Sequence, residues 1–133
     1  MIYLAGACAC EPDGGRGWRK EFREKFDNAT KEFVHVIDPT QYFDYENPKK
    51  YQIDNKQIMT TLLHYVKKSD IVVVNLENSI HSCGTCMELM YAKELGIPVI
   101  GFGESEVYPW ARECCWVVLD DLDSVIDYIF TFF

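Results

Sequence analysis

Residues 69–100 constrain the fold more than any other part of the sequence. They open with a continuous run of isoleucine and valine at residues 71–74. Such a run is typical of a strand that is buried on both faces of a parallel sheet. A polar loop over residues 77–82 follows, then a helical pattern from Gly84 to Leu95, and then a second apolar run at Val99 and Ile100. This order predicts strand, loop, helix and strand, with the loop at the edge of the sheet where open α/β folds bind ligands.

The rest of the chain continues the same alternation. Residues 2–7, 33–37 and 114–119 have the apolar character of strands. Trp18, Phe22, Phe26 and Ala29 recur at helical spacing, so a helix is expected to cover the sheet there. Further helices are predicted over residues 51–68 and after Asp121. Five strands alternating with four helices predict a doubly wound parallel sheet in a single domain, residues 1–133.

Charge and composition exclude several classes of function. The formal net charge is −8, and a protein that binds a nucleic acid polymer needs a basic face. No apolar run approaches the roughly 20 residues of a membrane span. The first residues lack the basic start of a secretory signal, so we expect a cytoplasmic protein whose six cysteines are reduced. A small anionic ligand remains possible, because a helix N-terminus can bind phosphate.

Glu88 is the most informative single residue. It lies one turn into the helix of the central unit, within the sequence MELMYA. Thr85-x-x-Glu88 is also a capping-box pattern, in which the glutamate binds a backbone amide, so the motif alone leaves a structural role open. Three further segments accompany it, namely IYLAG at residues 2–6, Asp38-Pro39, and GIPVI at residues 96–100. With these, residues 2–101 resemble the nucleoside 2-deoxyribosyltransferase family.

The resemblance implies a specific chemistry. In that family the glutamate matched by Glu88 attacks the anomeric carbon of a deoxyribosyl group and expels the base, and a second base or water then resolves the glycosyl-enzyme. The tyrosine matched by Tyr3 positions the carboxylate. A carboxylate nucleophile divides one difficult displacement into two easier ones. We expect the helix N-terminus to lower the pKa of Glu88 and keep it ionised.

Two positions depart from the transferases proper. Ser82 replaces an aspartate, as it does in the branch of the family that hydrolyses 2′-deoxynucleoside 5′-monophosphates, where the serine holds the 5′-phosphate. Arg16 or Arg19 would then be phosphate partners, although Ser82 could equally be a simple N-cap. Leu62 replaces the family's other catalytic aspartate. Asp54, two helical turns earlier and expected on the same helical face as Leu62, either takes over that role or is a solvated charge.

The cysteines offer a different class of function. Cys83 and Cys86 form a C-x-x-C motif at a helix N-terminus, where the pKa of a thiol is lowered, as in thiol oxidoreductases. Cys8, Cys10 and His81 could join them in a zinc site, but Cys-x-Cys is a poor spacing for zinc. The chemistry that the resemblance implies requires no metal and no organic cofactor, so we expect neither.

Together with the resemblance, these features predict a flavodoxin-like α/β domain that binds a 2′-deoxyribonucleoside or its 5′-monophosphate and cleaves or exchanges its N-glycosidic bond. A nucleotide-binding protein without turnover is the alternative. The resemblance also implies a homodimer or larger homo-oligomer, for which the aromatic residues 130–133 would suit an interface. Loop aromatics could stack on the base, namely Tyr42, Phe43, Tyr45, Tyr108 and Trp110. The predicted site residues are Glu88, Tyr3 and Asp54 for catalysis, and Gly6, Ala7, Arg16, Arg19, Ser82, Gly84 and Thr85 for substrate binding.

Overall fold

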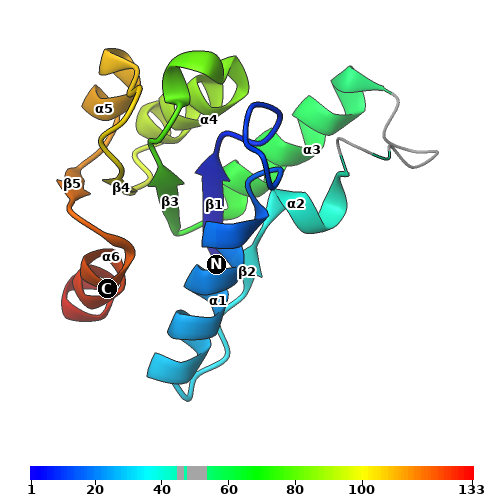
Figure 1. Ribbon diagram of the computed structural model, residues 1–133. Coiled ribbons are helices and arrows are strands. Elements are labelled where there is room, and N and C mark those ends of the chain that lie inside the picture. The colour runs from blue at the N-terminus through cyan, green and yellow to red at the C-terminus, as the bar shows by residue number, and fades with distance from the viewer. Residues whose placement is uncertain (45–46, 48–53) are drawn as a thin grey trace.

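The computed structural model describes residues 1–44, 47 and 54–133, and in this part of the chain five parallel strands form one sheet in the order β2-β1-β3-β4-β5. This is the flavodoxin-like order, so the predicted fold class is confirmed. None of the helices in the described ranges is long and apolar enough to cross a membrane. In chain order the elements are β1 (Ile2–Gly6), α1 (Arg16–Ala29), β2 (Val36–Ile37), α2 (Pro39–Tyr42), α3 (Asn55–Lys68), β3 (Ile71–Asn75), the 3-10 helix η1 (Ser79–His81), α4 (Cys83–Glu94), β4 (Val99–Phe102), α5 (Pro109–Glu113), β5 (Val117–Leu119) and α6 (Leu122–Phe132) (Figure 1).

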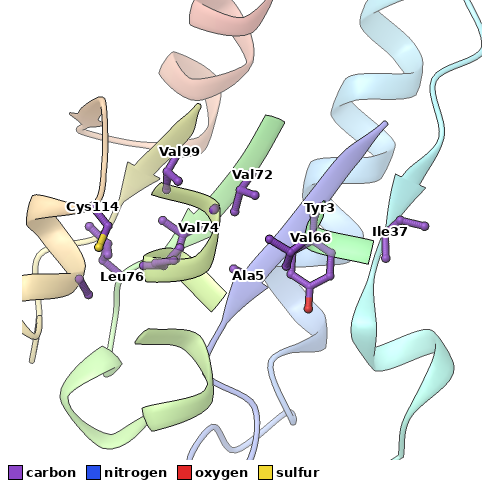
Figure 2. Close-up of a cluster of buried hydrophobic side chains, with 12 residues drawn as sticks. Tyr3, Ala5, Ile37, Val66, Val72, Val74, Leu76, Val99 and Cys114 are labelled. Carbon is purple, nitrogen blue, oxygen red and sulfur yellow. The ribbon is translucent and has the colours of Figure 1, made fainter. Parts of the chain in front are cut away.

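Helices cover both faces of the sheet. Successive side chains of a strand point to opposite faces, so on β1 Ile2 and Leu4 pack in the cluster that contains residues of α1 and α6. Tyr3 and Ala5 pack in the other cluster, with residues of α3, α4 and α5. Figure 1 shows α1 and α6 in the lower part of the view and α3, α4 and α5 in the upper part. Figure 2 shows Tyr3 and Ala5 beside the valines of β3. The β-branched strands are therefore buried on both sides, as their sequence predicts.

The strand order places a crevice beside β1. After β1 the chain moves to the outer strand β2, and it then returns to the other side of β1 to form β3. Gly6, the last residue of β1, is in register with Asn75, the last residue of β3. The loops that follow these two strands therefore start side by side at the carboxyl edge of the sheet. Open α/β sheets bind ligands at such a reversal of strand order.

Two predicted strands are shorter than their sequences indicate. In the second, only Val36 and Ile37 pair with β1 as strand, and Phe33 is 94% exposed. In the fifth, the prediction of strand at Cys114 and Cys115 was wrong. Their amides donate to carbonyls of the preceding residues 110–112, which extends the helical turn of α5. That helix, predicted as loop, begins with Pro109, which is favoured in the first turn.

The helix predicted over residues 51–68 begins at Asn55 in the described chain, and residues 51–53 lie outside it. Asp54 ends the preceding segment as the N-cap of α3, since its Oδ1 accepts a hydrogen bond from the Lys56 amide at 2.9 Å. The prediction that Asp54 shares a helical face with Leu62 was therefore wrong. Tyr45, one of the loop aromatics, also lies outside the described residues.

Candidate active site

A pocket of about 370 Å³ opens at the carboxyl edge of β1 and β3. One wall is α3, another is the turn from η1 into α4, and the end of β1 with its following loop completes it. The pocket therefore lies at the reversal of strand order. Its lining includes Gly6, Arg19, Leu62, Ser82, Gly84 and Glu88.

Glu88 lines this pocket and is bound from behind by Tyr3, which lies 85 positions away in sequence. The Tyr3 hydroxyl donates a hydrogen bond to Glu88 Oε1 at 2.8 Å. Tyr3 is fully buried in β1 and faces the helix layer that contains α4, so the sheet holds the hydroxyl in place. Glu88 is partly buried and lines the pocket. The fold thus presents one carboxylate, held by a buried phenol, to a ligand-sized space.

The capping-box interpretation of Thr85 and Glu88 is wrong. The helix begins at Cys83, so Ser82 rather than Thr85 is the N-cap. The Thr85 hydroxyl instead shares a hydrogen bond with the Ser82 hydroxyl at 2.7 Å. Glu88 lies in the second turn and binds Tyr3. Its carboxylate is therefore available for chemistry in the pocket.

The pKa of Glu88 is raised to about 7, mainly because burial disfavours the charged form. The hydrogen bond from Tyr3 and the charge of Arg19 both lower this pKa, but less than burial raises it. The prediction that the helix N-terminus would lower the pKa was wrong, because the dipole effect is confined to the first turn. Near neutral pH the carboxyl group therefore exists in both protonation states.

Arg19 contributes positive charge beneath the pocket. It belongs to α1 and is only 1% exposed, because its guanidinium binds the backbone where β1 ends. It donates to the carbonyl oxygens of Leu4 at 3.3 Å, Gly6 at 2.9 Å and Gly15 at 2.7 Å. Asp38, also 1% exposed, lies 3.8 Å away. Arg19 therefore lies on α1 rather than in the glycine-rich loop, and it lines the pocket as a buried cation whose donors bind the backbone.

Hydrogen bonds to the side chain of Asp13 hold the glycine-rich loop after β1. Asp13 accepts hydrogen bonds from the amides of Gly15 and Gly17, both at 2.8 Å, and these bonds lower its pKa. Gly15 has φ of 75°, and a Cβ there would meet Ala7 O at 2.4 Å. Arg16 is exposed and pairs with Asp44 at 3.3 Å. The amides of Gly15 and Gly17 and the Arg16 side chain thus have partners within the protein.

The start of α4 forms the polar rim of the pocket. Ser82, Gly84 and Thr85, which the sequence analysis predicts to bind substrate, all line it. The Ser82 side chain makes no capping hydrogen bond to the helix backbone, and its hydroxyl shares a hydrogen bond with Thr85. Helix geometry leaves the first backbone amides without an acceptor inside the helix. The rim therefore combines two hydroxyl groups with the N-terminal end of a helix.

The structure does not bring Asp54 to Glu88. Asp54 is exposed and caps α3, whereas its neighbour Asn55 lines the pocket. Leu62 lines the pocket too, where the resemblance predicted a carboxylate in related proteins. Gly6 lines the pocket at the end of β1, and Ala7 is buried beside it. The α3 wall of the pocket is mostly apolar, with Ile58, Met59, Leu62 and Leu63 in the lining. Apolar residues at helical spacing are typical of a core face, so the sequence did not mark them as pocket residues.

The cysteines do not form the alternative sites. All six are free. Burial raises the pKa of the Cys86 thiol, the second cysteine of the C-x-x-C motif, and no disulfide joins it to Cys83. No group of three or more side chains within the described ranges could hold a metal ion. The thiol oxidoreductase and zinc interpretations therefore have no support in the described residues.

A pocket at the reversal of strand order, with a tyrosine-held carboxylate and a helix start at its rim, defines a ligand-binding α/β protein of the flavodoxin-like type. The chain belongs to the nucleoside 2-deoxyribosyltransferase family, whose model matches residues 2–117. This places it in a family of glycosyl-transfer enzymes.

Solved structures share the fold. A conserved protein from Enterococcus faecalis V583 has a TM-score of 0.79 at 17% identity, over 98% of this chain and 96% of that one. A 2-deoxyribosyltransferase from Bacillus psychrosaccharolyticus has a TM-score of 0.73 at 18% identity, over 98% of this chain and 93% of that one. A 2-desoxiribosyltransferase from Leishmania mexicana has a TM-score of 0.71 at 20% identity, over 98% of this chain and 97% of that one. No match was found among curated proteins.

Proposed function

We propose that this protein cleaves or exchanges the N-glycosidic bond of a 2′-deoxyribonucleoside or its 5′-monophosphate, with Glu88 as the nucleophile. The observation that supports this most is the 2.8 Å hydrogen bond from Tyr3 to Glu88 inside the pocket. A nucleophilic carboxylate must be held in one orientation with an oxygen open to substrate. Glu88 meets this requirement, because Tyr3 binds one oxygen and the residue lines the pocket.

The reaction would proceed in two displacements. A Glu88 oxygen bonds to C1′ while the bond from C1′ to the base nitrogen breaks and its electron pair leaves with the base. Water or a second base then attacks C1′ and releases Glu88. Each displacement inverts C1′, so the overall reaction retains configuration. The buried Tyr3 hydroxyl would hold the carboxylate during attack and stabilise it again as it leaves.

The pocket supports a 5′-phosphate at the start of α4. The amides of the first turn and the Ser82 hydroxyl can donate to phosphate oxygens, and the positive end of the helix dipole favours the negative charge. Gly84 leaves this rim open, since no atom lies within 4 Å of the place where a Cβ would stand. We therefore favour the monophosphate as substrate.

The second candidate function is nucleotide binding without turnover. It is favoured by Leu62, which puts an apolar side chain in the pocket on the α3 wall. An apolar wall suits the face of a base but supplies no proton. The two candidates differ in whether free base is released.

The test is chromatography of free base after incubation with 2′-deoxynucleosides, their 5′-monophosphates and the ribose counterparts. Release of base from a deoxy substrate, with a deoxyribosyl adduct on the Glu88 peptide in mass spectrometry, is the expected result. Adding a second base distinguishes exchange from hydrolysis. Binding by calorimetry without release of any base would instead establish the binding protein.

Replacing Tyr3 by phenylalanine is expected to lower kcat/KM for base release about 10- to 100-fold at pH 7. The hydrogen bond from Tyr3 lowers the pKa of Glu88, so its loss raises that pKa further. Activity increases with pH as Glu88 ionises, and the variant should therefore reach half its maximal activity at higher pH than the wild type. The measurement is kcat/KM from pH 5 to 9. Tyr128→Phe in α6 is the matched control, and an unshifted profile in Tyr3→Phe would contradict the positioning role.

A homo-oligomer is part of this proposal. Three aromatic residues at the C-terminus are exposed in the described chain, namely Phe130, Phe132 and Phe133. Exposed apolar patches of this kind commonly mark protein contacts. We place the expected self-association surface there.

A further inference from the structure

His81 is a pocket residue to which the two-step reaction above assigns no role. It ends η1, immediately before the helix entry at Ser82, and it lines the same pocket as Glu88. Its side chain is 57% exposed, so it lies at the opening rather than in the interior. Glu88 approaches from α4 within the pocket, and His81 stands on the segment that leads into that helix.

The other titratable groups in the described lining do not suit proton donation to a departing base. Glu88 must be ionised to attack. Arg19 uses its donors on three backbone carbonyls and does not give up its proton. Burial raises the pKa of Cys8, and a thiol is a weak donor. Cys83, also at the rim, is again a thiol. Imidazole is the side chain that both gives and takes a proton near neutral pH.

Glu106 fixes the orientation of His81. Its Oε2 lies 2.9 Å from His81 Nε2, which leaves the other ring nitrogen, Nδ1, for a ligand. The backbone also joins the two segments, since the Ile80 amide donates to Glu106 O at 3.1 Å. The Glu77 carboxylate accepts from the amides of Glu104 at 2.8 Å and Ser105 at 3.1 Å. The loop after β4 is thereby bound to the loop after β3.

Glu106 adopts a backbone conformation that residues other than glycine rarely use, with φ of 55°. Asn78, at the start of η1, has φ of 58°. Such conformations cost free energy and persist where the surroundings hold a functional geometry. Both lie in the two loops that carry the imidazole and its carboxylate.

We propose that His81 is a catalytic proton donor to the leaving base and that Glu106 is its positioning residue, an inference that rests on the proposed glycosyl transfer. In the first step the proton on Nδ1 of the imidazolium moves to the base as the bond to C1′ breaks, while Nε2–H stays bonded to Glu106. In the second step neutral His81 takes a proton from the attacking water or base. The proton balance is restored at the end of each turnover.

The test compares two substrates whose leaving groups differ in their need for a proton. The base of an ordinary 2′-deoxynucleoside 5′-monophosphate must gain a proton, whereas the base of 7-methyl-2′-deoxyguanosine 5′-monophosphate already carries positive charge and departs as neutral 7-methylguanine. His81→Gln is expected to slow release of the ordinary base about 100-fold and of 7-methylguanine less than about 3-fold. His64→Gln, an exposed histidine of α3 outside the lining, should slow neither.

The outcomes separate this inference from the function on which it rests. If Glu88→Gln abolishes both reactions while His81→Gln slows both equally or neither, His81 is not the proton donor and the glycosyl transfer stands. If the wild type releases neither base, the proposed function fails and the proton donor with it.

Two variants of Glu106 test its positioning role. Glu106→Ala removes the acceptor for Nε2–H, and it is expected to slow release of the ordinary base about 10-fold while 7-methylguanine is released within about 3-fold of the wild-type rate. Glu106→Gln keeps an acceptor at the same place and should restore most of the rate for the ordinary base. Equal rates for the two variants, or slowing of both bases by Glu106→Ala, would overturn the positioning role.

Discussion

Replacing Glu88 by glutamine is expected to reduce release of free base at least about 1000-fold, because an amide oxygen cannot replace the attacking carboxylate. Glutamine keeps the size of the side chain and an acceptor for the Tyr3 hydroxyl, so the fold is retained. The measurement is base release under saturating substrate. Glu94→Gln, an exposed residue of the same helix, is the control and should keep full activity. Residual turnover within 10-fold of the wild type would assign the nucleophile elsewhere.

The same substitution should also stabilise the protein, but only at high pH. The pKa of Glu88 is near 4.5 when the chain is unfolded and about 7 when it is folded, so the folded state binds the proton more tightly. Stability of the wild type therefore falls as pH rises from about 4.5 through 7, by about 2 to 3 kcal/mol. The Glu88→Gln variant does not undergo this loss.

Urea unfolding at pH 5 and pH 8 measures this difference. We expect the variant to exceed the wild type by about 2 kcal/mol at pH 8 and by much less at pH 5. An equal difference at both values would show that burial does not raise the pKa of this carboxyl. The protein would thus maintain an ionisable group that costs stability where it is active, as expected for a catalytic residue rather than a structural one.

Replacing Arg19 by methionine is expected to destabilise the protein by about 3 to 5 kcal/mol. Methionine fills a similar volume but removes the Arg19 donors from three carbonyl oxygens, and it leaves buried Asp38 with Arg23 at 3.5 Å as its remaining cationic neighbour among the ion pairs of the described chain. The measurement is the free energy of unfolding in urea. Lys20→Met, at the next position of the same helix with 71% of the side chain exposed, is the control and should change stability by less than about 0.5 kcal/mol.

Arg19 also lowers the pKa of Glu88. Any Arg19→Met protein that folds should therefore reach half-maximal activity at higher pH than the wild type. A variant with wild-type stability would contradict the structural role, and an unshifted pH profile would contradict the electrostatic one.

The sheet could be predicted because its strands carry local signals. The β-branched run at residues 71–74 is buried on both faces, and no polar residue interrupts it. The meeting of Tyr3 and Glu88 could be predicted only through the resemblance to a family, since nothing local joins residues 85 positions apart. The periodicity of the sequence predicted the helix that contains Glu88. It could not predict the pKa of Glu88, because this depends on how deeply the fold buries the carboxyl group.

Arg19 shows why the rest could not be predicted. An arginine among charged residues of an amphipathic helix is expected on the solvated face, as its neighbour Lys20 is. Its burial depends on three carbonyl oxygens from β1 and the following loop, which only the tertiary structure brings together. The prediction that Asp54 shares a helical face with Leu62 failed for a local reason. Its spacing matched a helical face, but its side chain caps the helix and so does not belong to that face.

The open space at Gly84 separates the shape of the pocket rim from the packing of the fold. A Cβ at this position would meet no atom within 4 Å, so a methyl group can be added at the rim without displacing a neighbour. Alanine there would even favour the helix. Under the proposed function, a substitution at this one position would change the entrance to the pocket while leaving the hydrogen bond between Tyr3 and Glu88 in place.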